Sequence, residues 1–159
     1  MVHAISNFCS QIELIMLQRI QTLYILFALA AVGSSLAFDW VTYTVNGETV
    51  SFMTDTNALV MQVLVGLSVI TSIAVMARFK NRQAQMKLAN VAMLDMLIVF
   101  VAFGFLHYQQ IEAFGATEGL DLSYDIAPAL PIVALVLLWM AKKAIKKDDD
   151  LVRSVDRLR

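Results

Sequence analysis

The sequence predicts an all-α membrane protein: a four-transmembrane-helix bundle with a small outer β-hairpin between helices 1 and 2 and a cytoplasmic amphipathic C-terminal helix. Three observations support this prediction. Of the 159 residues, 59% are hydrophobic and only 16% are charged, whereas soluble domains average roughly 45–50% apolar and about 25% charged residues. The apolar residues gather in four blocks, and the basic residues all fall on one side of the spans that these blocks define.

The four apolar blocks are each close to the length that crosses a hydrocarbon core of about 30 Å. They cover, approximately, residues 20–38, 58–77, 88–107 and 126–144. With their connections they form a predicted membrane domain, residues 16–147. The uninterrupted apolar run of the fourth block, residues 126–141 up to the first lysine, is the shortest of the four, apart from Asp95 in the third. Pro128 and Pro131 lie near its start, where proline is tolerated because the first N–H groups of a helix have no helical partner.

The basic residues orient the predicted spans. All 12 Lys and Arg residues lie on one side of a four-span arrangement. The charged residues on the other side are all acidic. Basic loops face the cytoplasm, which predicts a multi-pass membrane protein with both termini cytoplasmic. The basic residues are Arg19, Arg78, Lys80, Arg82, Lys87, Lys142, Lys143, Lys146, Lys147, Arg153, Arg157 and Arg159, and the acidic residues opposite them are Asp39, Glu48, Asp55, Glu112, Glu118, Asp121 and Asp125.

Asn46-Gly47 lies between two short runs of alternating apolar and hydroxyl residues, which is the strongest short-range signal for a β-hairpin. A two-residue turn predicts the pairs Val45–Glu48, Tyr43–Val50 and Val41–Phe52. A lone hairpin is marginal in water, so its apolar face should rest on something. We expect it to cap the outer ends of the helices. The alternative is a docking surface for a partner, with the candidate residues Val41, Tyr43, Val50 and Phe52. The acidic segment 108–124 predicts an irregular surface loop.

The tail carries apolar residues at helical spacing, with acids before bases as a helix dipole favours. We expect residues 148–159 to form a cytoplasmic tail helix beside the membrane, with a second candidate docking face at Leu151, Val152 and Val155. The lysines in segment 142–147 could meet anionic headgroups or RNA. The three aspartates that follow weaken both interpretations, so we expect these lysines chiefly to enforce topology, and we expect no nucleic-acid partner.

The start of the chain allows two interpretations. Residues 1–15 carry no basic residue, so they are predicted to be an N-terminal extension ahead of an alternative start at Met16. The first apolar block could instead belong to a cleaved signal peptide, because Ser35-Leu36-Ala37 fits a small-x-small cleavage site. Cleavage would leave three spans with the same orientation, so the charges do not decide between the two.

Asp95 interrupts the third apolar block near its middle. A carboxylate at the centre of a bilayer costs roughly 2.5–3.5 kcal/mol on insertion scales. Asp95 is therefore the candidate membrane-embedded functional acid, as a proton relay or coupling site. The structural interpretation, which we favour, is a hydrogen bond between the second and third spans, with the candidate partners Ser68, Thr71 and Ser72.

The sequence contains no recognisable catalytic constellation. Cys9 is the lone cysteine, so no intrachain disulfide can form, and nothing resembles a nucleotide loop, a zinc site or a serine nucleophile arrangement. Metal or haem ligation by His107 would need a partner, and His3 lies on the other side of the predicted membrane. We therefore expect no enzyme, no metal and no cofactor, and we interpret His107 as an interface residue.

Three segments resemble a known family. They are the opening Met16-Leu-Gln-Arg-Ile-Gln-Thr-Leu-Tyr24, the basic connection Lys80-Asn-Arg-Gln-Ala-Gln-Met-Lys87 and the tail from Ala144 to Arg159. Over about residues 16–159, the chain is similar to the uncharacterised bacterial membrane-protein family called domain of unknown function 4293. The resemblance implies a multi-pass protein of the bacterial inner (cytoplasmic) membrane with four spans, a start at Met16 and an uncleaved first span. It implies no particular activity.

Two functional hypotheses follow. The first is a structural or accessory, non-enzymatic subunit that acts among membrane lipids through a membrane-protein partner or through self-association. It rests on the missing catalytic constellation and on the two candidate docking elements. The alternative is a small proton-coupled transporter that uses Asp95 and works as a dimer, which is an analogy of architecture only.

Overall fold

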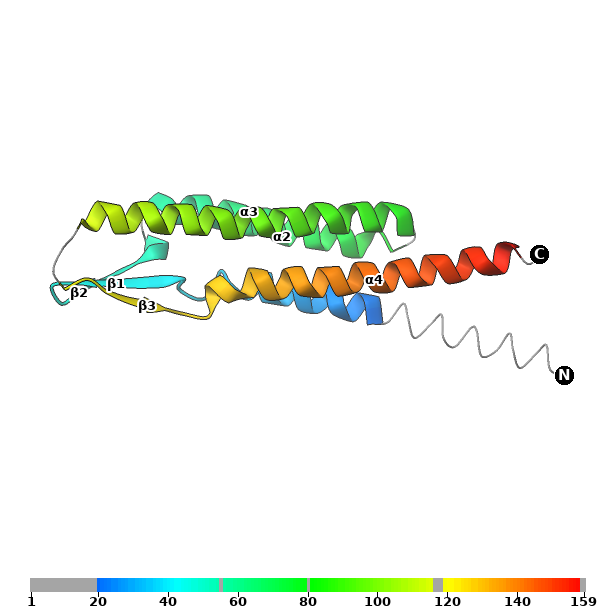
Figure 1. The fold of residues 1–159 in the computed structure, drawn as a ribbon, viewed down its shortest axis with the longest axis horizontal. Coiled ribbons are helices and arrows are strands. Elements are labelled where there is room, and N and C mark those ends of the chain that lie inside the picture. The colour runs from blue at the N-terminus through cyan, green and yellow to red at the C-terminus, as the bar shows by residue number, and fades with distance from the viewer. Residues whose placement is uncertain (1–19, 55, 80, 116–118, 158–159) are drawn as a thin grey trace.

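The computed structural model describes residues 20–54, 56–79, 81–115 and 119–157. The predicted N-terminal extension, residues 1–15, and the alternative start at Met16 lie outside these residues. The described chain is elongated: four helices run side by side, and a small sheet lies at one end (Figure 1). The described chain begins and ends at the opposite end of the helices (Figure 1).

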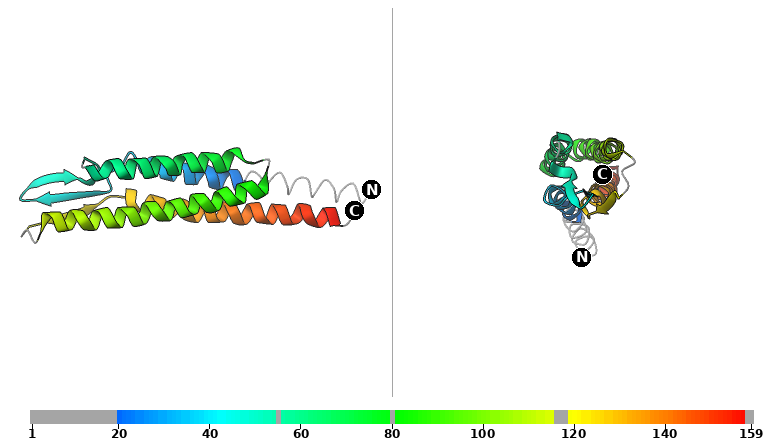
Figure 2. Two further views of the ribbon diagram at one scale, coloured as in Figure 1. Left: turned by 90° about the horizontal axis from the view of Figure 1, so that it is seen from above. Right: turned by 90° about the vertical axis from the view of Figure 1, so that its left-hand side faces the viewer.

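Four helices form the long part of the fold. They are the first helix, described over Ile20–Ser34, α2 (Thr56–Ala77), α3 (Arg82–Phe114) and α4 (Leu130–Arg157). α3 packs against both α2 and α4, and Gln21 Nε2 of the first helix donates to the Ala144 carbonyl oxygen of α4 at 3.2 Å. Viewed along the long axis, the four helices surround a common centre (Figure 2). The prediction of a mostly helical fold with four helices is confirmed, and α2, α3 and α4 are long and apolar enough to cross a membrane.

α3 is longer than the predicted third span. It begins after Asn81, whose side-chain oxygen accepts the Ala84 N–H at 3.1 Å, and it ends at Gly115, which has a positive φ of 66°. Its 33 residues extend about 50 Å at a rise of about 1.5 Å per residue. Because a hydrocarbon core is only about 30 Å thick, the apolar block 88–107 corresponds to the middle of α3 and not to its ends.

α4 also continues past its predicted end. We expect a separate tail helix over residues 148–159, but α4 runs without a break to Arg157. The prediction of helix is confirmed there, and the prediction of a separate element is wrong. No glycine or proline follows Pro131, and helix-favouring Ala, Lys and Leu fill the junction. Pro131 itself lies in the first turn of α4, and Pro128 lies in the short 3-10 helix η2 (Ala127–Ala129) that precedes it.

The predicted hairpin is confirmed. Its strands are β1 (Val41–Val45) and β2 (Glu48–Ser51). Their register includes the predicted pairs Tyr43–Val50 and Val45–Glu48. Asn46 and Gly47 have φ values of 53° and 87°, which is the backbone that a two-residue type I′ turn requires.

A third strand completes the sheet. β3 (Asp121–Tyr124) pairs antiparallel with the other side of β1, so the strand order is β2-β1-β3. Val41 pairs with Tyr124, and the predicted Val41–Phe52 pair is not formed, because Phe52 begins the short 3-10 helix η1 (Phe52–Thr54). The expectation of an irregular loop over residues 108–124 is therefore wrong: this segment contains the last turns of α3 and an additional strand.

Aromatic rings join the sheet to the C-terminal part of α3, which we call its outer part. The centroid of the Phe103 ring lies 4.9 Å from that of Trp40 and 5.5 Å from that of Phe52. The centroid of the Tyr43 ring lies 5.3 Å from that of Phe114. Trp40, Tyr43 and Phe52 are fully buried. The apolar face of the hairpin therefore caps the helices, which is the role that we expect from the sequence.

His107 adds two hydrogen bonds to this junction. Its Nδ1 lies 2.6 Å from the Tyr43 hydroxyl, and its Nε2 lies 3.0 Å from the Tyr124 hydroxyl. Its ring stacks on Phe103 with 5.5 Å between centroids. A neutral imidazole has one donor and one acceptor nitrogen, and a tyrosine hydroxyl can serve either. His107 therefore links both β1 and β3 to α3.

We expect Tyr43→Phe to destabilise the protein more than Tyr124→Phe. Removing the buried Tyr43 hydroxyl leaves a polar group of His107 without its partner, at a cost of about 1–3 kcal/mol. Tyr124 is 58% exposed, so water can replace its hydroxyl. Thermal unfolding in detergent, followed by circular dichroism, measures both. Tyr108→Phe is the matched control, because the Tyr108 hydroxyl bonds to Glu112 on the exposed surface of α3. Equal shifts for Tyr43→Phe and the control would contradict the proposed junction.

Candidate functional site

Asp95 lies on the buried side of α3, with 7% of its surface exposed. Thr71 Oγ1 of α2 donates to Asp95 Oδ2 at 3.2 Å, so the predicted bond between these two helices forms through one of its three candidate partners. The same Thr71 Oγ1 lies 3.0 Å from the Ser68 carbonyl oxygen. A hydroxyl has one hydrogen, so Thr71 shares it between its own helix and Asp95.

The other two candidate hydroxyls bond within α2. Ser68 Oγ donates to the Leu64 carbonyl oxygen at 3.0 Å, and Ser72 Oγ donates to the Ser68 carbonyl oxygen at 2.8 Å. Both serines are fully buried. These three hydroxyls of α2 are therefore used for helix-internal bonds and for one bond to α3. The functional interpretation of Asp95 stays a prediction.

The interior of the helices combines small residues with larger apolar residues such as Ile25, Met61 and Leu138, and further large apolar residues face outward. The small, fully buried residues include Ala28, Ser35, Ser68, Ser72, Ala89, Ala92, Ala134 and Ala141. By contrast, the exposed fraction is 66% for Leu59, 64% for Ile70 and 68% for Val101. An apolar surface of this kind promotes association in water. In a bilayer, small residues let helices approach closely while large ones meet the acyl chains.

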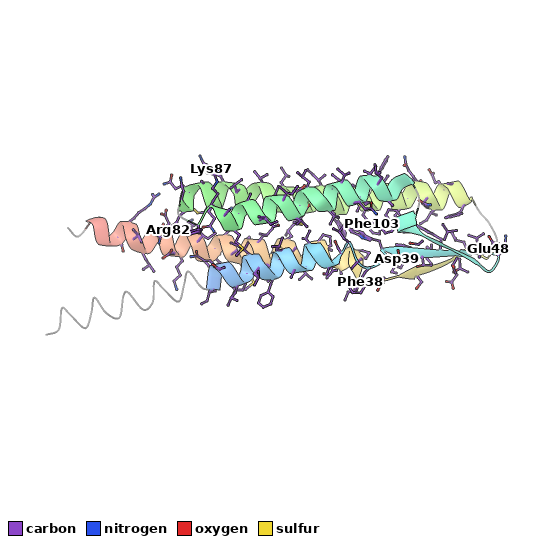
Figure 3. The ribbon with its side chains drawn as sticks, turned by 180° about the vertical axis from the view of Figure 1, so that it is seen from behind. Phe38, Asp39, Glu48, Arg82, Lys87 and Phe103 are labelled. Atoms are coloured by element: carbon purple, nitrogen blue, oxygen red, sulfur yellow. The ribbon has the colours of Figure 1, made fainter. Side chains whose placement is uncertain are left out.

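Charged side chains mark the two ends of the bundle. Arg82 and Lys87 lie towards one end, and Asp39 and Glu48 lie towards the other, near the sheet (Figure 3). The separation seen in the sequence is therefore also a separation along the long axis of the molecule. We refer to these two ends as the basic end and the sheet end.

At the basic end, Arg82 and Asp148 form an ion pair between α3 and α4. Arg82 Nη2 lies 2.9 Å from Asp148 Oδ2, and the Asp148 side chain is fully buried. The pair is a charge contact and not an aligned hydrogen bond, because neither carboxylate oxygen has a hydrogen-bond partner among the described residues. Gln85 and Gln21 are also buried. Polar side chains thus occupy the interior of the bundle at this end.

The burial of Asp148 shows that the core of the bundle continues into the segment where we expect a separate tail helix. α4 buries one stripe of residues at alternating intervals of four and three. Its members are Ala134, Leu138, Ala141, Ile145 and Asp148. The stripe is therefore readable in the sequence as the periodicity of the fourth span continued into the charged segment. Predicting a separate tail helix from residue 148 hides this continuity, because it divides the stripe between two elements.

The candidate docking residues of the hairpin lie mostly inside the fold. Val41, Tyr43 and Phe52 are fully buried within the core of this chain. The docking prediction is therefore wrong for these three, since their surface is already covered. Val50 is half-buried.

The candidate docking residues of the tail lie at the basic end. Leu151 is 37% exposed, and Val152 is half-buried. The side chain of Val155 lies outside the part that the structure describes. Leu151 lines a groove between the first helix and α4, so this part of the tail stays a candidate contact surface.

The fold and its polar contacts define a class: a mostly helical protein with three helices long and apolar enough to cross a membrane and a three-stranded sheet at one end. Within the described ranges, no three His, Cys, Asp or Glu side chains gather where they could hold a metal ion. The chain belongs to the family described as Domain of unknown function (DUF4293), whose model matches residues 17–158. The family prediction from the three sequence segments is confirmed. No curated protein matches the chain.

We expect Thr71 and Asp95 to be energetically coupled. A double-mutant cycle of Thr71→Val and Asp95→Leu should give a coupling free energy of about 0.6 kcal/mol, and not above about 1.7 kcal/mol, which is the range for hydrogen bonds between helices in membrane proteins. Unfolding in mild detergent measures it. The control cycle pairs Asp95→Leu with Ser72→Ala, whose hydroxyl bonds within α2, and should show no coupling. If neither cycle showed coupling, the structural interpretation of Asp95 would fail.

Proposed function

We propose that the chain is an integral protein of the bacterial inner membrane with four spans and with both termini on the cytoplasmic side. The supporting observation is the apolar surface of the helices: large residues such as Leu59, Ile70 and Val101 face outward, and buried alanines and serines let the helices approach one another closely. The separation of Arg82 and Lys87 from the acidic sheet end (Figure 3) agrees with the rule that basic segments stay in the cytoplasm.

The first helix serves as one of the four spans in this proposal. Ile25, Ala28 and Val32 belong to the shared core. Trp40 Nε1 donates to the Ser35 carbonyl oxygen at 3.1 Å, directly at the segment that fits a cleavage site. Cleavage after Ala37 would remove these buried side chains from the bundle, so we favour an uncleaved first helix.

Within the membrane, we propose a non-enzymatic accessory role that depends on a protein partner. The sheet edges are better docking elements than the hairpin face, which the chain covers itself. β2 and β3 are the two edge strands, and an edge strand offers backbone N–H and C=O groups that a further strand can pair with. Thr49 of β2 and Ser123 of β3 are exposed. Both edges lie at the sheet end, where a periplasmic partner would meet them.

The alternative is a proton-coupled transporter, and the burial of Asp95 within a span is the observation that favours it. Proton relays use chains of ionisable groups. Segments 58–77 and 88–106 contain no acid or base besides Asp95, and Thr71 provides it with a structural partner. We therefore prefer the accessory role, and the coupling between Thr71 and Asp95 separates the two.

Single cysteines test the topology. In a Cys9→Ser background, Glu48→Cys should react with a membrane-impermeant maleimide added to intact spheroplasts, because Glu48 lies at the sheet end (Figure 3). Gln83→Cys, near the start of α3, should react only in inverted vesicles. Both positions are exposed. Whether each cysteine is labelled therefore depends only on which side of the membrane the maleimide can reach. Recovery of the chain in the soluble fraction, or labelling of Gln83→Cys from outside, would refute the arrangement.

Photo-crosslinking tests the accessory role. A photoreactive residue at Thr49 or Ser123 should capture one partner reproducibly in native membranes, because each lies on an edge strand. The control position is Gln109, which is exposed on the outer part of α3 but belongs to no strand. If the edge positions gave only crosslinks of the chain to itself, or if Gln109 captured the same proteins, we would abandon docking at the edges.

A further inference from the structure

A groove lies between the first helix and α4 at the basic end of the bundle. Its volume is about 710 Å³, which is within the usual range of small-molecule sites, roughly 300–1,000 Å³. Its apolar lining comes from Ile20 and Tyr24 of the first helix and from Trp139, Met140 and Leu151 of α4. Trp139 is 54% exposed, so a large aromatic surface is open to a ligand.

Three lysines line the same groove: Lys143, Lys146 and Lys147. They share a face of α4 with Trp139, because positions four, seven and eight residues apart project in similar directions. Lys143 Nζ lies 5.5 Å from the centroid of the Trp139 ring, which is a cation–π distance. The groove therefore joins an apolar floor to a cationic rim, and this combination fits an anionic amphiphile.

The aspartates that follow the lysines do not cancel this charge. Asp148 is buried and pairs with Arg82 of α3. Asp149 pairs with Arg153 at 3.0 Å. Of the three, only Asp150 lines the groove, so among the described lining residues three lysines stand against one carboxylate. The objection that the sequence raises against anionic headgroups depends on all three aspartates neutralising the lysines, and the structure removes two of them.

We propose that this groove binds an anionic phospholipid of the cytoplasmic leaflet. The proposal rests on the proposed membrane placement, in which α4 passes at this depth from its apolar segment to its charged one. The acyl chains contact Ile20, Tyr24 and Trp139. The phosphate contacts the lysine ammonium groups, which bind phosphate as point charges. A soluble anion would leave the apolar floor uncovered, and a zwitterionic lipid would bring a cation towards the lysines.

Native mass spectrometry of the full chain in detergent tests the proposal. The probes are phosphatidylglycerol and phosphatidylcholine with the same acyl chains. We expect the unmodified chain to retain phosphatidylglycerol preferentially. The groove variant Lys143→Gln/Lys146→Gln/Lys147→Gln should lose roughly a factor of five in this preference for each lysine that contacts the phosphate. Asp150→Asn should raise the preference, because it removes the carboxylate from the lining.

The matched control is Arg78→Gln/Lys87→Gln/Lys142→Gln. It removes the same number of positive charges from the basic end, but none of these residues lines the groove. It should keep the preference of the unmodified chain. An equal loss in both triple variants would overturn the proposal, since only the general charge of this end would then matter. An unchanged preference in the groove variant would overturn it as well.

Quenching of Trp139 provides a second measurement that does not depend on lysine substitutions. Brominated phosphatidylglycerol in mixed vesicles should quench Trp139 fluorescence more than brominated phosphatidylcholine at the same fraction. Trp40 is fully buried at the sheet end and supplies the unquenched background, which a Trp139→Phe variant isolates. Equal quenching by both lipids would count against a specific site.

Two further outcomes separate the possible failures. A chain that starts at Met16 should show at least the preference of the full chain; if it bound phosphatidylglycerol no better than phosphatidylcholine, the lipid proposal would fail. If the chain did not reside in a membrane at all, the proposed function would fail first. A membrane-embedded chain without lipid preference would refute only the groove.

Discussion

Packing of β1 against the outer part of α3 is the contact on which the rest of the fold depends. β1 is the central strand, so β2 and β3 are held through it. The sheet is also connected to every helix: β1 follows the first helix, β2 leads through η1 to α2, and β3 lies between α3 and α4. Strands of four and five residues make a sheet that is marginal by itself. Phe103 and His107 stabilise it, and the sheet in return fixes the outer ends of all four helices.

α4 shows how one helix can serve two environments. Its buried stripe continues from Ala134 to Asp148, whereas its outward face changes from exposed valines, such as Val133 and Val136, to lysines. The stripe can continue because α3 extends beside it as far as Arg82, which provides Asp148 with a charge partner. A buried ion pair adds little net stability, but losing one partner is costly. The pair therefore mainly fixes how α4 is aligned with α3.

The features that the sequence predicts correctly are those whose signal lies within one segment, even where the partner lies on another helix. Asn46-Gly47 determines the turn, and a carboxylate within an apolar block requires a nearby donor, which Thr71 supplies. β3 is missed because its pairing with β1 joins segments far apart in the chain, and Asp121–Tyr124 has little apolar alternation of its own. The two uses of the His107 ring are missed for the same reason, because Tyr43 and Tyr124 reach it from separate strands.

The groove lysines illustrate a different limit of sequence reasoning. Lys147 and Asp148 are neighbours in the chain, yet successive residues of a helix project about 100° apart. One therefore lines the groove while the other is buried against α3. Summing the charges of residues 142–150 along the chain gives a value close to neutral. Summing them separately for each face of the helix shows that the groove face is cationic.

The same reasoning bears on where the function resides. In the described middle of the bundle, the hydroxyls of Ser68, Thr71 and Ser72 are engaged in hydrogen bonds, and Asp95 has a partner on the neighbouring helix. At the two ends, the chain instead presents features that call for an additional molecule: two sheet edges at one end and a lysine-lined apolar groove at the other. A transporter needs exchangeable groups along its middle, whereas an accessory protein needs contact surfaces at the membrane boundaries. The placement of satisfied groups inside and open surfaces at the ends therefore favours the accessory role.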